Sequence, residues 1–286
     1  MQTDMTVGKP MKMLLNFTIP VFLGNVFQQL YSMADAVIVG KFVGTKGLAA
    51  VGATGTITFL IIGFLMGVTT GVTVLTSQKF GAGRMDEMRK TVGNAAILSA
   101  VIAVVMTAVS MLGMHRLLVF MHTPEDIFDG AYGYIMIICA GIFTQVLYNL
   151  VSSILRALGN SKTPLYFLIL AAGLNIVLDL VFIIFFHWGA PGAAWATVIS
   201  QGVSGVLCLI YMWKAVPELK MKKEDWCFNR DIAVKQISVG IPMGLQYSIT
   251  AIGGMMLQSS LNILGSYAVA AFTAGSKIDN IFTQAF

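Results

Sequence analysis

The sequence predicts an all-α protein that crosses a membrane several times. Hydrophobic residues make up 57% of the 286 positions and charged residues only 11%, whereas soluble domains have about 45–50% apolar and about 25% charged residues. The apolar positions also form runs of 20 or more residues, the length that an α-helix needs to cross the hydrocarbon core. Such runs are too long and continuous for the alternating strands of a transmembrane barrel, so we expect helices.

Seven complete spans and the start of an eighth follow from the apolar runs. The first run is too long for the apolar part of a signal peptide and contains Pro20, Gln28 and Asp35, so we interpret it as the first span. The expected complete spans are 14–43, 48–77, 93–121, 132–155, 165–186, 192–213 and 236–264. The eighth begins near Tyr267 and continues to Phe286.

The loops between these spans differ in charge on the two sides of the membrane. Fourteen Lys and Arg residues fall in the N-terminus and in the loops on its side, and only Lys41, Lys46 and Arg116 fall in the opposite loops. Cytoplasmic loops carry the excess of basic residues in membrane proteins. The sequence therefore predicts a multi-pass protein of the cell membrane with a cytoplasmic N-terminus. The net charge of +5 reflects this topology rather than binding to nucleic acid.

The chain after residue 235 resembles its own beginning. Ile19-Pro20 near the start of the first span recurs as Ile241-Pro242 in the seventh, 222 residues later. Three small residues after the first span also recur after the seventh, once a gap of one residue is allowed in the alignment. Gly44, Ala49 and Ala50 correspond to Gly265, Ala270 and Ala271. We therefore expect a six-helix bundle over 1–213, a basic cytoplasmic linker over 214–235 and the start of a second bundle over 236–286.

This repeat predicts a longer architecture. An even number of spans precedes the second copy, so both copies have the same orientation in the membrane. Two complete copies would give twelve spans in roughly 440 residues, with the present chain ending within the eighth span.

Polar side chains inside the predicted spans are the main functional candidates, because an ionisable group at membrane depth costs roughly a few kcal/mol or more. Asp35 lies in the first span and Asp179 in the fifth, where Asn175 shares its helix face. Further polar groups on the first, fourth and sixth spans are Gln28, Asn149, Thr197 and Gln201.

These polar groups have two possible roles. Carboxyl, amide and hydroxyl groups can join helices by hydrogen bonds, and for the amides and Thr197 this structural role stays open. A neutral amide would join helices without the desolvation cost of a charge, so we favour a functional role for Asp35 and Asp179. A buried carboxyl group can exchange a proton because burial disfavours its charged form. Two carboxylates with amide and hydroxyl oxygens also suit a hard cation.

Three other patterns give structural expectations. Gly63, Gly67 and Gly71 form a stripe of small residues that predicts close helix packing on the second span. Arg156 ends the fourth span and is expected to extend its charged group towards the cytoplasmic surface. Lys277 and Asp279 are two residues apart, so they do not face each other on a helix and we do not pair them.

Several motifs together resemble the multidrug and toxic compound extrusion (MATE) transporters. The opening of that family is similar to Ile19-Pro20 followed by the segment 30–35 (LYSMAD) and the segment 48–52 (LAAVG). The family's regions after the fourth span and in the fifth and sixth spans resemble the segments 154–160 (ILRALGN), 174–179 (LNIVLD) and 192–197 (GAAWAT). The resemblance extends from about Pro10 to Phe286, and the fifth-span motif is its most specific part.

The resemblance implies twelve spans in two six-helix bundles and the export of cationic, amphipathic compounds in exchange for protons or sodium ions. It also implies a cation or proton site in the first bundle, with a possible sodium site at the same residues. By motif, the binding residues are Asp35, Asn175, Asp179 and Thr197, and the surrounding cavity or supporting residues are Tyr31, Gln28, Asn149 and Gln201. No cofactor beyond the coupling ion is expected.

Other function classes fit the sequence less well. A flippase of related architecture, moving lipid-linked oligosaccharides or lipid precursors, would need several cationic residues inside the first bundle, which instead contains two acids. An enzyme would need a nucleophile or metal cluster, and the sequence has no Walker A loop, catalytic triad or HExxH motif. The expected partners are therefore small cationic or amphipathic molecules and the lipid bilayer, with no nucleic acid and no particular oligomeric state.

Overall fold

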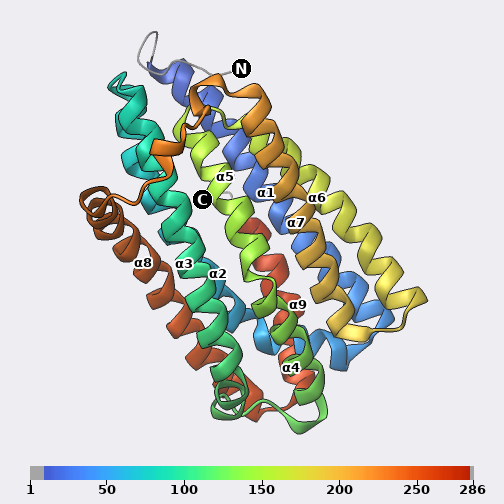
Figure 1. Cartoon of the computed structure of the whole chain (residues 1–286). Coiled ribbons are helices and arrows are strands. Elements are labelled where there is room, and N and C mark those ends of the chain that lie inside the picture. Colours follow the sequence, from blue (N-terminus) through green and yellow to red (C-terminus); the bar gives the residue numbers. More distant parts are fainter. Residues whose placement is uncertain (1–9, 284–286) are drawn as a thin grey trace.

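The computed structural model describes residues 10–283, and within this range the chain is almost entirely helical and contains no strand. The helices run mainly along one direction and pack side by side (Figure 1). Their bounds are α1 (Pro10–Phe42), α2 (Thr45–Gly81), α3 (Met85–Phe120), α4 (Glu125–Ala140), α5 (Ile142–Ala157), α6 (Lys162–Leu180), α7 (Gly189–Ala215), α8 (Arg230–Ile263) and α9 (Ser266–Thr283).

Five of the described helices are long and apolar enough to cross a membrane: α1, α2, α3, α6 with the turn that follows it, and α7. The bent pair α4 and α5 makes a sixth if the two are counted as one span. The prediction of a multi-pass helical protein is therefore confirmed. The expected seventh span does form one continuous helix, α8. It is not among the helices apolar enough to count as a span, because it contains polar side chains such as Gln236, Gln246 and Gln258.

The predicted single span over 132–155 is wrong in detail. Its helix begins earlier, at Glu125, and it is broken into α4 and α5, which meet at 48°. The break lies at Gly141, where a Cβ atom would stand 2.3 Å from a methyl group of Val198 on α7. A side chain at this position would push α7 away, so the glycine lets α7 approach the bend.

The predicted fifth span is helical but irregular at its end. After α6 the chain widens into a π-helical turn (η1, Val181–Phe185) directly after Asp179 and Leu180. Trp188 stacks on Phe182 and Phe186 around this turn, with ring centroids 5.0 and 5.3 Å apart, and the two phenylalanine rings are tilted towards each other at 6.1 Å. Single π turns inside helices often accompany functional sites, because they shift the side chains on either side out of the regular α-helical register.

The expected stripe of small residues on α2 is confirmed as a packing surface, and its partner is α8. A Cβ atom at Gly71 would stand 2.4 Å from Cα of Gly240, and one at Gly67 would stand 2.6 Å from Cα of Gly244. The two backbones therefore touch directly. Inside a bilayer, helix association depends on such close van der Waals contact because lipid chains are as apolar as leucine side chains.

The segment between α7 and α8 is held against the first bundle along its length. It contains two 3-10 turns, η2 (Pro217–Leu219) and η3 (Lys223–Trp226). The N–H of Asn229 donates to Oδ1 of Asn94 on α3 at 3.0 Å, and Oδ2 of Asp225 lies 3.8 Å from Nε of Arg89, also on α3. At the start of α8, the Gln236 amide donates to the backbone oxygens of Val72 (3.0 Å) and Thr91 (2.9 Å).

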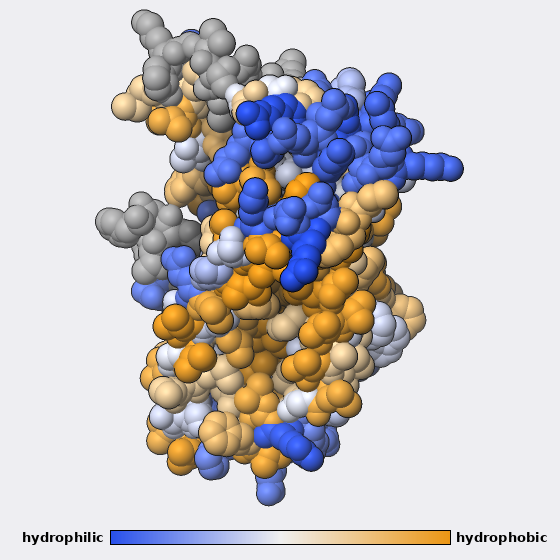
Figure 2. Space-filling view, turned by 60° about the vertical axis from the view of Figure 1, so that its left-hand side comes forward, coloured by the Kyte–Doolittle hydropathy of each residue, from blue (hydrophilic) through white to orange (hydrophobic). Residues whose placement is uncertain are grey.

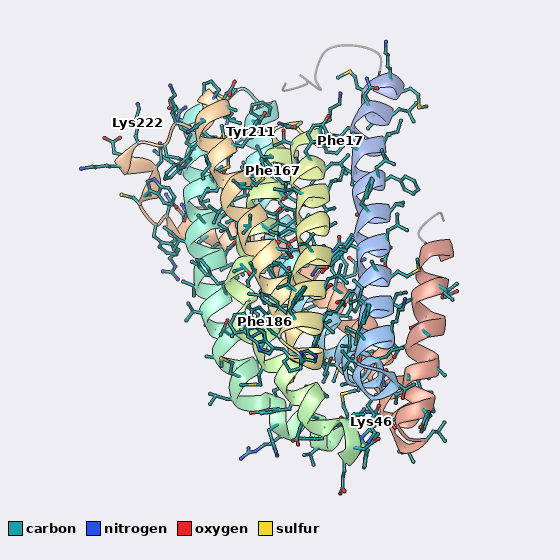
Figure 3. All side chains as sticks on the ribbon, turned by 90° about the vertical axis from the view of Figure 1, so that its right-hand side faces the viewer. Phe17, Lys46, Phe167, Phe186, Tyr211 and Lys222 are labelled. Atoms are coloured by element: carbon teal, nitrogen blue, oxygen red, sulfur yellow. The ribbon has the colours of Figure 1, made fainter. Side chains whose placement is uncertain are left out.

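Polar and apolar surfaces are separated along the molecule. Figure 3 places Lys222 near one end of the bundle and Lys46 at the opposite end. Figure 2 shows hydrophilic residues gathered at the first of these ends, above a broad hydrophobic surface. This distribution matches a helix bundle whose middle faces lipid and whose ends face water.

Candidate functional site

Two carboxyl groups meet inside the first bundle. Asp35 on α1 is 8% exposed and Asp179 on α6 is fully buried. The helices α1 and α6 pack against each other, and the two carboxyl groups lie within hydrogen-bonding reach of one another. Their second oxygens, Oδ1 of each residue, are buried without a partner in the described structure. Asp35 precedes the end of α1 at Phe42 by about two helical turns, or about 10 Å, so the pair lies in the half of the bundle nearer Lys46.

Asn175 and Thr197 complete the arrangement on α6 and α7. In one orientation, the Asn175 amide nitrogen donates to the Thr197 hydroxyl at 3.4 Å. In the opposite orientation it donates to Oδ2 of Asp179 at 3.1 Å, while its oxygen accepts from the Thr197 backbone N–H at 3.3 Å. The second orientation satisfies both ends of the amide. Asn175 lies on the same helix face as Asp179, as its place four residues before it predicted, and in this orientation it links Asp179 to Thr197 on α7.

Two tyrosines border the carboxyl pair. Tyr31, one turn before Asp35, brings its hydroxyl within hydrogen-bonding reach of the Thr197 side chain. Tyr134 on α4 is buried and lies close enough to interact electrostatically with Asp35, Asp179 and Tyr31. The structure thus brings Asp35, Asn175, Asp179, Thr197 and Tyr31 into one cluster, and it adds Tyr134.

The carboxyl pair has a direct chemical consequence. An ionised carboxylate only accepts hydrogen bonds, so two carboxyl groups can hydrogen-bond to each other only when at least one of them carries a proton. The pair can therefore share one proton between α1 and α6. If that proton leaves, two negative charges remain in a water-poor site, where a compensating cation or a change in structure becomes favourable.

A lysine from outside the first bundle reaches this region. Nζ of Lys277 on α9 donates to Oγ of Ser32 at 2.6 Å, and Ser32 precedes Asp35 by three residues on the same helix face. The ammonium group also attracts the Asp35 carboxylate. Sequence reasoning missed Lys277 as part of the site and left it unpaired, because spacing within one helix carries no signal for a contact between α9 and α1.

Two of the expected supporting residues lie apart from the carboxyl cluster. Gln28 and Asn149 line a smaller polar cavity of about 60 Å³ between α1, α5 and α6, together with Arg156. Arg156, which was predicted to extend its charged group to the surface, lines this cavity at the end of α5 and is half-buried there. Gln201 is buried on α7 one turn beyond Thr197, and its amide oxygen has no partner among the described residues.

Comparison with known proteins identifies the family. The MatE family model matches residues 20–181, which is more than half of the chain and includes most of α1, all of α6 and both aspartates. The chain belongs to the MATE family. Members of this family are transporters and not enzymes, as the sequence predicted.

Individual MATE proteins agree with this assignment. A probable multidrug resistance protein of Bacillus subtilis, YpnP, is 32% identical over 98% of this chain and 62% of its own length. Among solved structures, an inward-facing MATE multidrug transporter matches 88% of this chain and 57% of its own, with a TM-score of 0.81 and 28% identity. An outward-facing one matches 97% of this chain and 65% of its own, with a TM-score of 0.81 and 25% identity. The chain spans about three fifths of the length of the curated relatives it matches.

Proposed function

We propose that this chain provides the first bundle and the start of the second bundle of a twelve-span MATE antiporter in the cell membrane. It would export cationic, amphipathic compounds in exchange for protons or sodium ions, with the N-terminus in the cytoplasm. The observation that supports this proposal best is the pair of carboxyl groups of Asp35 and Asp179, which are buried between α1 and α6 within reach of each other.

The carboxyl pair favours the proton as the coupling ion. Asn175, Thr197 and Tyr31 supply hydrogen bonds that orient the pair and accommodate a changed charge. A sodium ion would use the same oxygens, but both carboxylates would first have to lose the proton that joins them. We therefore place proton exchange first and sodium binding at the same residues second.

Alternating access gives the pair its role in transport. Solved MATE relatives occur in inward-facing and outward-facing conformations. A ligand shifts such an equilibrium only if it binds the two states with different affinity. In our proposal the pair holds its proton in one state and releases it in the other, and the exported compound occupies the cavity between the bundles in the state that has released the proton.

The deciding experiment is coupled efflux by the full-length transporter in proteoliposomes with an imposed pH or sodium gradient. Asp35→Asn keeps size and hydrogen bonding but removes the titratable group, so gradient-driven efflux should fall to the background rate. Leu257→Asn is the matched control, because Leu257 occupies the position equivalent to Asp35 in the internal repeat and is 52% exposed on α8. We expect this control to retain most of the efflux.

The outcomes separate the alternatives. Efflux driven by the pH gradient alone supports the proton, and efflux driven by sodium alone at constant pH supports the cation. Normal coupled efflux by Asp35→Asn, or equal loss in Asp35→Asn and Leu257→Asn, would overturn the assignment of the site. Melting temperatures of the purified variants show whether each remains folded.

A second candidate is the translocation of an anionic lipid-linked precursor. One observation favours it: Arg156 at the smaller cavity and Lys277 beside Ser32 place two cations next to the surfaces of α1. Uptake of a labelled lipid-linked anionic precursor by the same vesicles, abolished by Arg156→Gln, would establish this function in place of drug export.

A further inference from the structure

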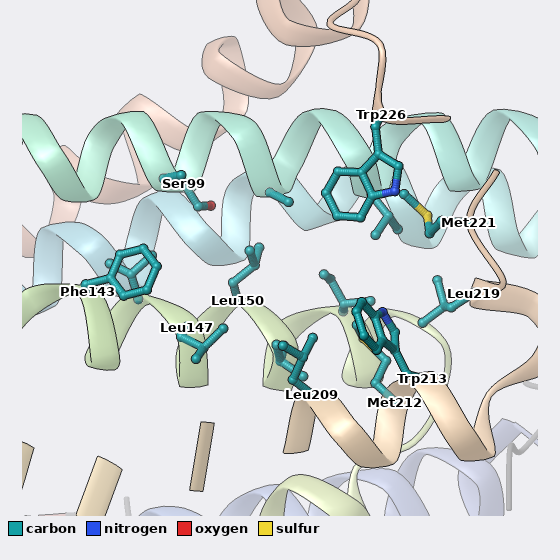
Figure 4. A pocket seen from close by; sticks show the side chains of 16 residues that line it. Ser99, Phe143, Leu147, Leu150, Leu209, Met212, Trp213, Leu219, Met221 and Trp226 are labelled. Atoms are coloured by element: carbon teal, nitrogen blue, oxygen red, sulfur yellow. The ribbon is translucent and has the colours of Figure 1, made fainter. Parts of the chain in front are cut away.

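An apolar groove lies between α3, α5 and α7, away from the carboxyl pair. It encloses about 230 Å³, and its walls include Leu147, Leu150 and Leu209 (Figure 4). None of the side chains that line it comes from α1, α6, α8 or α9. Ser99 gives it one hydroxyl group, which has no hydrogen-bond partner in the described structure. A cavity with such walls does not retain water, so in a membrane it should be filled by an apolar chain.

The mouth of the groove lies at the level where a membrane meets water. Trp213 at the end of α7 and Trp226 in the 3-10 turn η3 face each other across it (Figure 4). The two residues are 62% and 47% exposed. Indole side chains prefer the headgroup level of a bilayer because one edge is polar and the rest is apolar. The groove itself then lies at the depth of the acyl chains.

Basic residues lie in the segments that carry the two tryptophans. Lys214 follows Trp213, and Lys220, Lys222 and Lys223 lie in the segment that carries Trp226, all four exposed to solvent. Glu218 and Glu224 lie in the same segment. The third acid, Asp225, is buried and engaged by Arg89 and by the Lys222 backbone N–H. Four lysines against two remaining glutamates leave a positive surface, which attracts anionic headgroups.

We propose that the groove binds one acyl chain of an anionic phospholipid and that Lys220, Lys222 and Lys223 bind its headgroup. The apolar walls select a hydrocarbon chain, and the lysines at the mouth select a negative group at its end. A cationic amphipathic compound would fit the walls but not the lysines. The site is therefore distinct from the carboxyl pair and does not depend on the transport proposal.

Quenching of tryptophan fluorescence by brominated phospholipids tests this site directly. The full-length protein with Trp188→Phe and Trp195→Phe keeps Trp213 and Trp226 as reporters, and any further tryptophan outside the present chain is replaced in the same background. It is reconstituted in phosphatidylcholine vesicles that contain increasing amounts of brominated phosphatidylglycerol or brominated phosphatidylcholine. We expect half-maximal quenching at an at least fivefold lower mole fraction of the anionic lipid, since one lysine at an anionic surface contributes about fivefold in affinity.

Two variants separate the headgroup contact from the chain contact. Lys220→Gln/Lys222→Gln/Lys223→Gln should remove the preference for the anionic lipid, whereas Lys41→Gln/Lys46→Gln at the opposite end should keep it. Ala96→Leu places a larger side chain in the groove wall and should reduce quenching by both lipids. Ala108→Leu, at an exposed position of the same helix, is the control and should leave quenching unchanged.

Each result decides the proposal. Equal quenching by both lipids in the reporter protein, or an anionic preference that survives the triple lysine variant, would refute the headgroup contact. Quenching unchanged by Ala96→Leu, in protein with an unaltered melting temperature, would show that the chain does not enter the groove.

Discussion

Lys277 is the residue through which the second half of the chain touches the carboxyl pair. Its ammonium group binds Ser32 and attracts Asp35, so it stabilises the state in which Asp35 is ionised. We expect Lys277→Met to slow coupled efflux roughly tenfold or more, because a hydrogen bond to a charged group contributes about 1.5–3 kcal/mol. Efflux rates in proteoliposomes under a pH gradient measure this effect.

Two variants control the Lys277 measurement. Lys277→Arg keeps the positive charge and should recover a large part of the rate. Lys41→Met removes a lysine from the exposed end of α1 and should leave the rate near that of the parent protein. A normal rate in Lys277→Met would show that the contact with Ser32 has no part in exchange.

The central residues of the site were predictable from the sequence, and the outer ones were not. The four-residue spacing of Asn175 and Asp179 places both on one helix face. An aspartate inside a span is a functional candidate because burying its charge in the membrane costs free energy. Gln28 was grouped with Asp35 because both are polar and lie on the first span. Seven residues correspond to about 10 Å along a helix, so Gln28 faces the cavity of Arg156 instead. Tyr134 carries no such signal because a tyrosine in an apolar run is common.

Among the elements, the bend between α4 and α5 makes a specific packing prediction. Gly141→Ala would place its Cβ atom 2.3 Å from Val198 Cγ2, so α7 or the bend must shift. We expect a loss of roughly 1–3 kcal/mol in the free energy of unfolding, as for other overpacked sites, measured as denaturation in detergent.

The Val198 side chain provides the control for the bend. Val198→Ala removes the methyl groups that meet the added carbon. The double variant Gly141→Ala/Val198→Ala should therefore lose less stability than the sum of the two single variants. Strict additivity would show that the contact between α5 and α7 is not what requires glycine.

The contact between α2 and α8 leads to a second element-scale prediction. Gly71→Ala would bring a Cβ atom within 2.4 Å of Cα of Gly240, and a backbone atom cannot turn aside as a side chain can. We expect Gly71→Ala to lower the melting temperature of the purified transporter by several degrees, an effect in the range of roughly 1–3 kcal/mol.

Gly113→Ala on α3 is the matched control for Gly71, because no atom lies within 4 Å of a Cβ atom there. It should leave the melting temperature unchanged or raise it slightly, since alanine favours helices over glycine. Equal melting temperatures for both variants would contradict the close approach of α2 and α8.

The elements themselves were predicted from apolar run length, but their irregularities were not. The apolar run over 132–155 is continuous, so composition gave no sign of the break at Gly141, which depends on the contact with α7. The stripe of glycines on α2 did predict close packing, because small residues four apart on one helix face let another helix backbone approach closely. Its partner could not be read from spacing, since α8 begins more than 140 residues after α2 ends.

At the scale of the whole molecule, the two ends of the bundle should face opposite sides of the membrane. Figure 3 shows Lys222 and Lys46 at opposite ends. In a background with Cys227→Ser, a Lys222→Cys variant should react with a membrane-impermeant thiol reagent only from the cytoplasmic side. A Lys46→Cys variant should react only from outside. Cys139 and Cys208 are buried, so they give little background.

Labelling of both introduced cysteines from the same side would contradict this orientation. The side assignment itself came from the unequal distribution of basic residues, which is a whole-chain property and needs no knowledge of helix contacts. The packing of α8 on α2 and of α9 on α1 and α2 depends on contacts between helices. The residue pattern within one span does not reveal them.

The fastening of the α7–α8 segment to α3 has a mechanical consequence. A flexible linker would allow the helices on its two sides to move relative to each other. This segment is instead bound to Asn94 and Arg89 on α3. Gln236 also binds the first turns of α8 to α2 and α3. Any bending of α8 relative to its first turns is therefore expected beyond Gln236, at Pro242, which removes one helical hydrogen bond. The far end of α8 is held as well, because the Asn262 amide donates to the backbone oxygen of Met121 at 2.8 Å. A movement of this end away from α3 must first break that bond.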